Sequence, residues 1–457
     1  MRMFLAILIC KLGYFIGKRI GKGSSMPGKI ALKICPDILK RLELPGEIIA
    51  VTGSNGKTSV TEMIAAILRA DGKNIIYNQE GSNQTEGVTT LLLTHADRNG
   101  RVKADILLLE SDERYAAKTF QYFHPTRFVV TNLYRDQLTR NGHPESVYEA
   151  LSAALSYADM ELILNADDPL SSCFGREREK NNIYFGLDKC DISSDKPTGV
   201  YHDGAYCPVC GHKMKYGYAH YNHIGAYSCE NCGHAKHETD FTGTGLDLKN
   251  GVLELDNNIK ISLAFRSIYH VYNILAAYAL CRRVGVSAEV IAKAINHYML
   301  QNGRVKTFKL GARDGVLLTS KHENSIAYDT NLKYIAGLDK PCVILIIIDA
   351  VSRKYFTSET SWLWDIDFDL LNQENIKNII LSGRYCNDLA ERFSYTSIPS
   401  DKWKVIESIP DAAAELRVNQ NNNQNNNQDA NQDAKPDDLY VVTCFSDRDK
   451  LLKLTDK

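Results

Sequence analysis

The stretch EIIAVTGSNGKTS, residues 47–59, places a strand, a glycine-rich turn and the start of a helix in direct succession. Its first six residues contain the unbroken apolar run IIAV, which is typical of a strand buried in a parallel sheet. The turn Gly53–Thr58 follows at once, and the helical pattern SVTEMIAAILRA comes next. This order is the context that a phosphate-binding loop requires, although the spacing is shorter than in the common GxxxxGK[ST] form.

Each residue type in this turn suits the binding of a nucleotide. Glycines allow backbone N–H groups to converge on phosphate oxygens, and the N-terminus of a helix adds positive potential. Lys57 is predicted to reach the β- and γ-phosphates, and the Thr58 hydroxyl to bind Mg²⁺. We therefore take Gly53, Ser54, Asn55, Gly56, Lys57 and Thr58 as candidate nucleotide ligands. The alternative is an ordinary glycine turn with a solvated lysine.

A second Mg²⁺ ligand is expected at the end of a neighbouring strand. The apolar run 104–109 ends at Glu110, with Asp112 and Glu113 close behind it. We predict that Glu110 holds the metal directly or through water. The alternative is an acidic strand end that faces solvent.

Further strand patterns at 74–78, 127–132 and 161–165 alternate with helical patterns. Alternation of this kind predicts an α/β domain with a mostly parallel sheet covered on both faces. Ligands of such sheets bind at the carboxyl ends of the strands. Asn78, Asn132 and Asn165 are expected there, together with Glu110.

Four of the 12 cysteines form two CxxC pairs, Cys207 with Cys210 and Cys229 with Cys232, each followed by Gly-His. Two such knuckles predict a zinc ribbon with four thiolate ligands, whose role is structural because the site is coordinatively closed. A redox dithiol is the alternative. His212 and His234 follow the knuckles and are not expected to be ligands.

Composition limits the class of protein. The chain has 457 residues, of which 44% are apolar and 24% charged, and 54 basic residues are balanced by 55 acidic ones. No basic field is present for general nucleic-acid binding. No apolar run approaches the ~20 residues that span a bilayer. Paired, metal-type cysteines favour a reducing, cytoplasmic location.

The N-terminal residues 1–22 form a basic, apolar segment. At helical spacing, Phe4, Ile7, Leu8, Leu12, Phe15 and Ile16 share one side, with basic residues at its margins. Two interpretations remain. This side either packs on the domain that follows or rests on an anionic membrane surface as a peripheral contact.

Seven segments in order resemble the Mur ligase family, the ATP-dependent enzymes that build the peptide of bacterial cell-wall precursors. They are VTGSNGKTS, NQEGSN, LLLESDE, TNLYRDQLTRNG, LNADDP, YHVYNILAA and NGR, between about 45 and 305. The resemblance implies that ATP phosphorylates a carboxylate, which an amine then attacks. It also implies that Asn273 contacts adenine and that Arg304 approaches the phosphates. Asp167 and Asp168 are expected to line the floor of the site, or else to begin a helix at a turn.

A zinc ribbon inside such a domain is similar to one subfamily, the ligase-like subunits of lipid II isoglutaminyl synthase. The likeness includes PGKIALKICPDIL, HYNHIGAYSCENCG and SWLWDIDFDLL. It implies amidation of the α-carboxylate of D-glutamate in lipid II, giving D-isoglutamine. The ammonia is expected from a separate GatD-like glutaminase subunit. Competing hypotheses are a stand-alone Mur-type amino-acid ligase, a diverged paralogue with another partner, and a catalytically silent scaffold.

The C-terminal region is expected to form a second, Rossmann-like α/β domain. Strands are predicted at 342–349, 376–382 and 439–445, and a helix at 385–393. Family members carry DGxDxSW here, with aspartates that support the partner's glutaminase site. This chain has FTSETSW at 356–362, so Asp349 or Glu359 is the candidate acid, and both are alternatively ordinary exposed acids.

The predicted organisation has three parts and one insertion. Residues 1–44 form the amphipathic segment, 45–304 the central ATP-binding domain and 305–457 the C-terminal domain. The zinc ribbon at 201–238 interrupts the central domain. The asparagine- and glutamine-rich tract 419–432 is expected to be a disordered loop.

Overall fold

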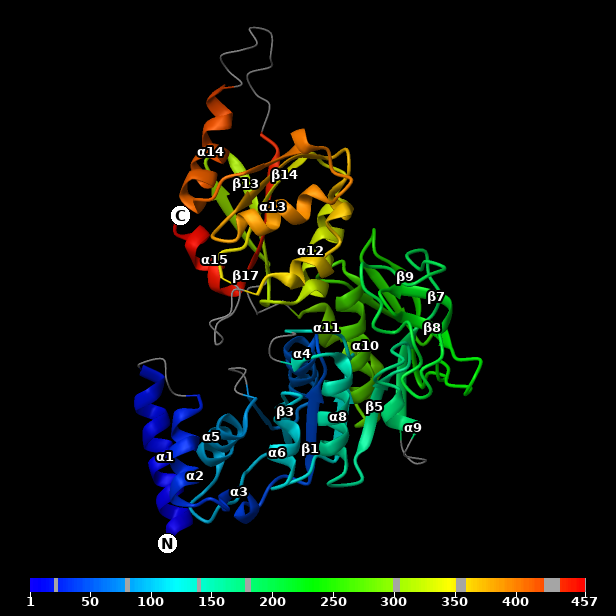
Figure 1. Cartoon of the computed structure of the whole chain (residues 1–457). Coiled ribbons are helices and arrows are strands. Elements are labelled where there is room, and N and C mark those ends of the chain that lie inside the picture. Colours follow the sequence, from blue (N-terminus) through cyan, green and yellow to red (C-terminus); the bar gives the residue numbers. More distant parts are fainter. Residues whose placement is uncertain are drawn as a thin grey trace. The chain divides into compact units, whose positions relative to one another are not determined.

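The computed structural model describes residues 1–19, 24–78, 83–137, 141–176, 182–298, 305–350, 359–422 and 436–456. The chain divides into two compact units (Figure 1). The first comprises residues 1–135, 141–198 and 202–299, and the second comprises 136–140, 199–201 and 300–457. The first unit therefore includes the N-terminal segment.

The first unit is built on a nine-stranded sheet with the order β11-β10-β9-β6-β5-β4-β1-β3-β2. Strands β1 to β6 and β9 all run parallel to one another. Strands β10 and β11 extend the sheet beyond β9 through antiparallel pairing. The strands are β1 (Glu47–Thr52), β2 (Ile75–Tyr77), β3 (Ile106–Glu110), β4 (Arg127–Val130), β5 (Glu161–Asn165), β6 (Asn182–Leu187), β9 (Phe241–Asp247), β10 (Val252–Leu255) and β11 (Ile259–Ser262).

Helices pack on both faces of this sheet, as expected for α/β order. One face packs against α5, α6 and α8 in a shared apolar core, while α4 and α10 contact each other and the strands. The helices are α1 (Arg2–Arg19), α2 (Met26–Ile34), α3 (Ile38–Arg41), α4 (Lys57–Ala70), α5 (Thr85–His95), α6 (Ala116–Phe120), α8 (Pro144–Leu155), α9 (Cys173–Arg176), α10 (Ile268–Arg283) and α11 (Ala288–Asn296). The predicted parallel sheet covered on two faces is confirmed.

Strand β1 lies between β3 and β4, and its register decides what gathers at its end. Val51 pairs with Glu110, and Thr52 pairs with Val130. All three strands run in the same direction, so their carboxyl ends lie side by side. The turn after β1 therefore starts beside the predicted metal ligand.

The insertion between β6 and β9 contains a two-stranded antiparallel sheet, β7 (Lys215–Tyr221) and β8 (Ile224–Ser228). The hairpin turns at Asn222 and His223, and Asn222 adopts a left-handed conformation with φ 43°. Asn tolerates positive φ better than most residues. The tip of the hairpin is buried, so this small sheet is packed into the first unit rather than projecting from it.

Helix α1 differs from the expectation. It packs on α2 and α5 (Figure 1), but through Ala6, Ile7 and Cys10. Of the side predicted from spacing, only Ile7 is buried, and the other five residues are 50–59% exposed. The helix is apolar all round, so spacing could not identify the packed face. Among the described residues, no helix has the length and apolar content needed to cross a membrane.

The second unit contains a six-stranded sheet with the order β12-β13-β17-β14-β15-β16, parallel except for the β12–β13 hairpin. The predicted strands and helix of this region are confirmed within two residues. Its elements are β12 (Val305–Leu310), β13 (Arg313–Ser320), α12 (Ser325–Ala336), β14 (Cys342–Ile347), η1 (Ser361–Asp365), η2 (Phe368–Leu371), β15 (Ile376–Ser382), α13 (Cys386–Ser394), η3 (Ser400–Lys402), β16 (Trp403–Val405), α14 (Ile409–Asn422), β17 (Asp438–Cys444) and α15 (Phe445–Leu452).

The predicted loop at 419–432 overlaps the end of α14. The helix continues to Asn422, so the first four residues of the tract are helical. The remaining ten residues of the tract lie outside the described residues. Local helix formation by the preceding DAAAELR segment extends into the tract, because helices grow by adding one hydrogen bond per residue.

A buried acid on α12 makes the stability of the second unit depend on pH. Burial raises the pKa of Asp329 to about 7, against the opposing effects of the Asp367 N–H and the charge of Lys333, while Asp367 and Asp365 raise it further. An unfolded aspartate titrates near ~3.9. The folded state therefore binds the extra proton between about pH 4 and 7, and the free energy of unfolding should fall as pH rises through that window.

This dependence can be measured selectively, because all three tryptophans (Trp362, Trp364 and Trp403) belong to the second unit. Urea unfolding followed by tryptophan fluorescence should give a lower midpoint at pH 7.5 than at pH 5. In Asp329→Asn the difference should shrink, because the amide does not titrate in this range. The fold should be kept, since the amide oxygen can still accept from the Asp367 N–H, which lies 2.8 Å from Asp329 Oδ1. Equal pH dependence in the two proteins would contradict this assignment.

Candidate nucleotide site and cysteine cluster

The turn between β1 and α4 has the backbone shape of an anion-binding loop. Gly53 and Gly56 have φ values of 128° and 87°, a region that favours glycine. Gly56 is the N-cap of α4, so the first N–H groups of that helix are directed at the loop. The dipole of α4 adds positive potential at the same point.

Neighbouring strands hold the loop in place. The Ser54 N–H donates to the Asn132 carbonyl, and the Asn55 N–H donates to Asn132 Oδ1, both at 2.9 Å. The Thr131 hydroxyl donates to the Asn55 carbonyl at 2.7 Å. Asn132 is thus confirmed at the carboxyl end of its strand, where it braces the loop.

Lys57 is 6% exposed and its ammonium group is held inside the site. Its Nζ donates to the Gly53 carbonyl at 2.5 Å and forms an ion pair with Glu113. Burial raises the pKa of Glu113, and the charge of Lys57 opposes that rise. Sequence reasoning placed Glu113 behind Glu110 without a role. The pairing depends on the register of β1 and β3, which no local pattern encodes.

Glu110 is buried at the end of β3, as predicted. Its backbone is fixed by Asn78, which donates to the Glu110 carbonyl at 2.9 Å and accepts from the Glu110 N–H at 2.8 Å. Glu110 Oε1 accepts from Asn83 Nδ2 at 3.1 Å. Thr58 lies in the first turn of α4. A carboxylate and a hydroxyl are hard oxygen donors, so this pair fits Mg²⁺.

Asn273 lies on α10 and reaches the loop. A Cβ built on Gly56 would lie 2.1 Å from Asn273 Oδ1, so the asparagine is in close contact with the loop itself. The structure thus brings Asn273 together with the glycine-rich turn, although the two are more than 200 residues apart. Arg304, the other ligand implied by resemblance, lies outside the described residues.

Gly56→Ala should weaken nucleotide binding roughly 10- to 100-fold, because left-handed backbone strain and crowding against Asn273 act together. Isothermal titration with ATP and Mg²⁺ measures this effect. Gly72→Ala is the matched control, since Gly72 has φ 80° at the far end of α4 and open space around its Cα. Equal affinities of the two variants for ATP would contradict the role of Gly56.

Asp167 and Asp168 are fully buried, and their oxygens serve the fold. Asp168 accepts from the backbone N–H groups of Leu133 and Leu170 at 2.8 and 2.9 Å. Asp167 accepts from Tyr272 at 2.6 Å and pairs with Lys236 at 2.6 Å. Of the two expectations, the structure favours the turn: these carboxylates join elements of the first unit.

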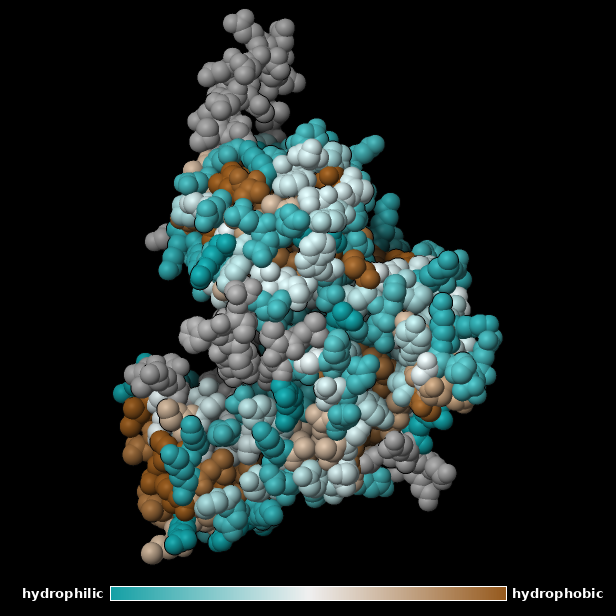
Figure 2. Space-filling model, viewed as in Figure 1, coloured by the Kyte–Doolittle hydropathy of each residue, from teal (hydrophilic) through white to brown (hydrophobic). Residues whose placement is uncertain are grey.

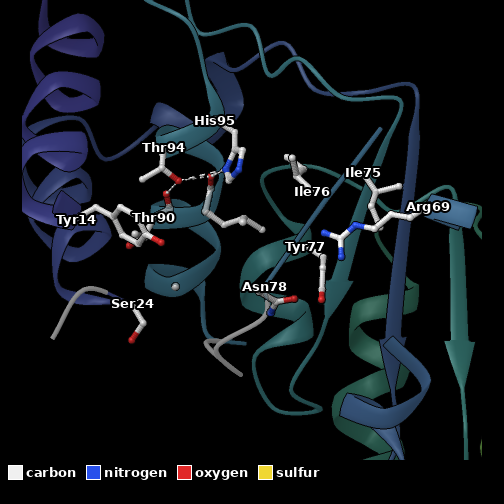
Figure 3. Close-up of a pocket in the computed structure, with 12 residues that line it drawn as sticks. Tyr14, Ser24, Arg69, Ile75, Ile76, Tyr77, Asn78, Thr90, Thr94 and His95 are labelled. Carbon is white, nitrogen blue, oxygen red and sulfur yellow. Dashed lines mark hydrogen bonds between the residues drawn. The ribbon is translucent and has the colours of Figure 1, made fainter. Parts of the chain in front are cut away.

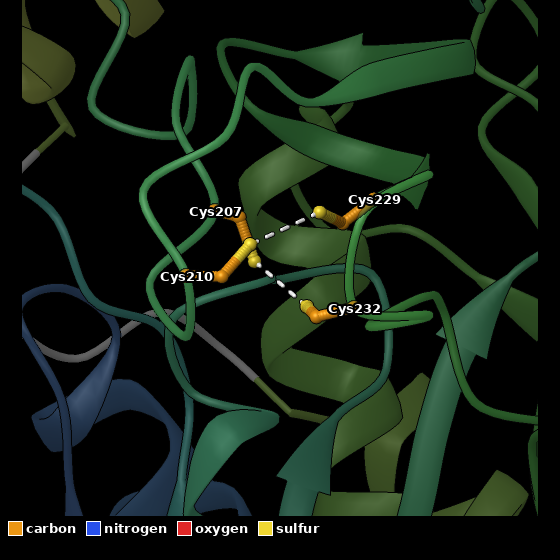
Figure 4. A group of neighbouring side chains, drawn as sticks. All are labelled: Cys207, Cys210, Cys229 and Cys232. Carbon is orange, nitrogen blue, oxygen red and sulfur yellow. Dashed lines mark hydrogen bonds between the residues drawn. The ribbon is translucent and has the colours of Figure 1, made fainter.

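The four knuckle cysteines converge, with all four sulfur atoms within 4.8 Å of one another (Figure 4). Cys207 Sγ lies 3.6 Å from Cys232 Sγ, and Cys210 Sγ lies 3.4 Å from Cys229 Sγ. Tetrahedral Zn–S bonds of ~2.3 Å require sulfurs ~3.8 Å apart. The set is therefore compatible with zinc. Among the described residues, this cluster contains no histidine, as expected for His212 and His234.

The two knuckles have the same geometry. Gly211 and Gly233 both have φ 73°, and each N–H donates to the carbonyl of the first cysteine in its pair, at 2.9 and 3.0 Å. A backbone hydrogen bond from His212 lowers the pKa of Cys210 to about 6, which favours the thiolate form that binds metal. Burial raises the pKa of Cys207 to about 12.

The ribbon hairpin reaches the nucleotide loop. Tyr221, at the end of β7, accepts a 2.5 Å hydrogen bond from the Tyr134 hydroxyl. The Ser54 hydroxyl donates to the Tyr134 carbonyl and accepts from the Tyr134 N–H, both at 2.9 Å. His234 of the second knuckle contacts the Pro169 carbonyl at 3.0 Å. The cysteine cluster is thereby joined to the glycine-rich turn through a short series of contacts.

A cavity of about 230 Å³ lies between α1, α5 and β2 (Figure 3). Tyr14, Thr90, Thr94 and His95 line it from the two helices. Asn78 lines it from the strand side, and the same side chain fixes the backbone of Glu110. The cavity is therefore next to the predicted metal ligand but separate from the glycine-rich turn.

The two candidate acids of the second unit have different surroundings. Asp349 follows β14, and its two oxygens accept from the Arg384 N–H at 2.8 Å and from Lys450. Burial works to raise the pKa of Asp349, but these two bonds outweigh it and lower the pKa. Glu359 is exposed, and two hydrogen bonds from Ser361 lower its pKa, one from the serine side chain and one from its N–H, which lies 2.7 Å from Glu359 Oε1.

Comparison with known proteins places these features in a common context. The profile of the Mur ligase middle domain matches residues 51–281, and that of the MurT ligase C-terminal domain matches residues 322–430. A Streptococcus pneumoniae relative named lipid II isoglutaminyl synthase (glutamine-hydrolyzing) subunit MurT is 30% identical over 411 residues, 87% of this chain and 88% of the relative. Its Staphylococcus aureus (strain COL) counterpart is 28% identical over 400 residues, 87% and 89% of the two chains.

Solved structures show the same fold at low identity. A pseudomurein peptide ligase type C from Methanothermus fervidus aligns with a TM-score of 0.67 and 18% identity, over 92% of this chain and 80% of that one. MurF from Acinetobacter baumannii aligns with a TM-score of 0.63 and 16% identity, over 93% and 80%. The arrangement of sheets and helices is thus shared with proteins that are only 16–18% identical to this chain.

Proposed function

The chain belongs to the Mur ligase family, and within it to the MurT subunits, and from this premise we propose that it is the ATP-dependent ligase subunit of a lipid II isoglutaminyl synthase. Its substrate is the α-carboxylate of D-glutamate in the stem peptide of lipid II, a cell-wall precursor. The product is D-isoglutamine. The observation that carries the proposal is the match to MurT relatives over 87% of the chain.

The proposed reaction has two steps. A carboxylate oxygen of the substrate attacks the γ-phosphorus of ATP, so that an acyl phosphate forms and ADP leaves. Ammonia then attacks the acyl carbon, the C–O bond to phosphate breaks, and the nitrogen loses a proton to give the amide. The first step develops charge on the transferred phosphoryl group, which preorganised positive groups stabilise.

The residues of the loop supply that stabilisation. The N–H groups at the start of α4, from Gly56 to Thr58, bind phosphate oxygens, and Lys57 offsets the charge of the β- and γ-phosphates. Thr58 and Glu110 hold Mg²⁺, which neutralises charge on the same phosphates when bound. Asn273 contacts the nucleotide near the loop, with adenine as the group implied by resemblance. The same resemblance implies Arg304 as a phosphate ligand, although this residue lies outside the described ones. Zn²⁺ occupies the four-cysteine cluster as a structural ion.

We further propose that a GatD-like glutaminase subunit supplies the ammonia, and that Glu359 is the acid presented to it. Asp349 is the weaker candidate, because both of its oxygens are engaged within the unit. Glu359→Gln should reduce glutamine-dependent amidation at least about tenfold and leave ammonium-dependent amidation unchanged, since a residue that orients a catalytic histidine affects only that half-reaction. Asp349→Asn is the matched control; loss of activity in that variant alone would reverse the assignment.

The function is tested with the purified chain, ATP, lipid II and either ammonium chloride or glutamine plus the glutaminase. ADP release and a mass decrease of about 1 Da in lipid II are the two readouts. Amidation with both nitrogen sources supports the whole proposal. Amidation with ammonium alone indicates a diverged paralogue with another partner. No ADP in either case would refute the ligase assignment and favour a silent scaffold.

The location follows from the substrate. A subunit that acts on a lipid-linked precursor is placed in the cytoplasm at the inner face of the membrane. Contact with that surface through residues 1–22 is the corresponding proposal.

A further inference from the structure

The surface of α1 and α2 carries an apolar patch of unusual extent. Figure 2 shows it as a brown area over these two helices, at the lower left of the view. Most other exposed large apolar residues of the described chain are scattered singly, which is normal for a protein surface. The patch, called here the outer face, consists of Phe4, Leu5, Leu8, Leu12, Phe15 and Ile16 of α1 with Met26 and Ile30 of α2, each at least 41% exposed.

Packing among the described residues does not account for this face. The opposite side of α1 supplies the packed residues, with Ala6 and Cys10 fully buried and Ile7 3% exposed. Gly13 faces α2, with Pro27 Cβ 3.5 Å from the position that a Cβ of residue 13 would occupy, which is an ordinary van der Waals contact. A helix that is apolar on all sides but packed on one needs a second apolar environment.

The charge carried by α1 and α2 themselves has one sign. The first 36 residues contain seven of the chain's 54 basic residues and none of its 55 acidic ones. Arg2, Lys18 and Arg19 on α1 and Lys29 and Lys33 on α2 are exposed. The Arg19 guanidinium lies 4.6 Å from the centre of the Phe15 ring, so a cation borders the apolar residues directly.

We propose that the outer face of α1 and α2 lies on an anionic phospholipid bilayer, with both helices parallel to the membrane plane. Apolar side chains enter the boundary of the acyl chains, while lysine and arginine extend to the phosphate groups. A purely basic rim favours lipid phosphates over a protein partner, whose charges are usually mixed. This inference deepens the location given under the proposed function by assigning the contact to named residues of α1 and α2, which are separate from the nucleotide loop.

Two helices make a stronger contact than α1 alone. Met26 and Ile30 extend the apolar area across α2, and Lys29 and Lys33 add cations on that helix. Since α2 also packs against α5 through Gly28, whose N–H donates to Thr90 Oγ1 at 2.8 Å, the contact is fixed to the first unit. A bound membrane would therefore orient that unit rather than tether it loosely.

Vesicle cosedimentation of the full chain tests this proposal. The chain should sediment with vesicles of equal phosphatidylglycerol and phosphatidylcholine, and less with phosphatidylcholine alone or at high salt. Lys18→Gln with Arg19→Gln should lower the partition coefficient about 25-fold, at roughly fivefold per cation. Leu8→Gln with Leu12→Gln should lower it roughly 100-fold. Tyr157→Gln, at a residue 45% exposed away from this face, is the matched control.

The outcomes separate this surface from the catalytic proposal. Lys57→Ala should bind vesicles like the unaltered chain, so failure of the ligase assay leaves this test intact. A chain that stays in solution with anionic vesicles, or a Leu8/Leu12 variant that binds normally, overturns the proposal. A lipid-free dimer that the same variant dissociates in sedimentation equilibrium also overturns it, in favour of contact between copies.

Discussion

Lys57→Ala should lower the rate of ADP-forming amidation roughly 100- to 1000-fold and leave the protein folded. The loss has this size because removal of one preorganised group that faces developing charge typically costs that much. Lys57 is buried and bonded to the Gly53 carbonyl, so its ammonium is positioned before the reaction begins. The rate is measured with ammonium chloride as the nitrogen source, which removes any contribution of the partner.

Two controls make this result interpretable. Lys73→Ala removes an exposed lysine just beyond α4 and should have no effect on the rate. Zinc content of about one per chain in Lys57→Ala would show that the first unit is intact, since the cysteine cluster belongs to that unit. Near-normal amidation by such a protein would refute the proposed role of Lys57.

Replacement of a cluster cysteine should have the second large effect. Cys207→Ser or Cys229→Ser should reduce bound zinc from about one per chain to nearly zero, because a structural site needs all four thiolates. The ribbon should then unfold locally, since metal-binding energy is its folding energy. Metal analysis and limited proteolysis within residues 201–238 measure the two effects. Cys190→Ser, outside the cluster, should retain the metal.

Loss of the ribbon should also reach the nucleotide loop. Tyr221 and Tyr134 connect the hairpin to Ser54, so ATP affinity should fall in the zinc-free variants. Tyr221→Phe isolates this connection: it keeps the metal and should weaken ATP binding only about fivefold, as expected for one hydrogen bond. Unchanged ATP affinity in the zinc-free protein would show that the ribbon serves the fold alone.

The parts of this molecule that could be read from sequence are those with local signals. Strand β1, its glycine-rich turn and α4 lie within 24 consecutive residues, and each has a local sequence pattern that indicates its conformation. Strand β14 is a continuous apolar run, and β15 and β17 contain the apolar runs IIL and LYVV. The cysteine cluster could also be predicted from the sequence, because the CxxC spacing within each knuckle fixes its geometry. Family resemblance supplied Asn273, which no local pattern identifies.

Other features depend on pairing across the chain. The sequence does not show whether Asp112 or Glu113 pairs with Lys57. The packed structure shows that the partner is Glu113. Asp167 is buried because Lys236, 69 residues later, returns to it. Strands β10 and β11 are absent from the sequence-based prediction, although VLEL and IKIS alternate. Strand β9, with which β10 pairs, contains two glycines and gives no strand signal. On α1, neighbouring Ile7 and Leu8 have opposite environments that residue type cannot distinguish.

The ion pair of Lys57 with Glu113 has a consequence for which anions the loop accepts. An incoming ligand must compete with an internal carboxylate for the same ammonium group. A monoanion such as chloride brings no more charge than the carboxylate it would displace, whereas a triphosphate brings several. We therefore expect multivalent phosphates to displace the carboxylate and to bind this loop in preference to monoanions such as chloride.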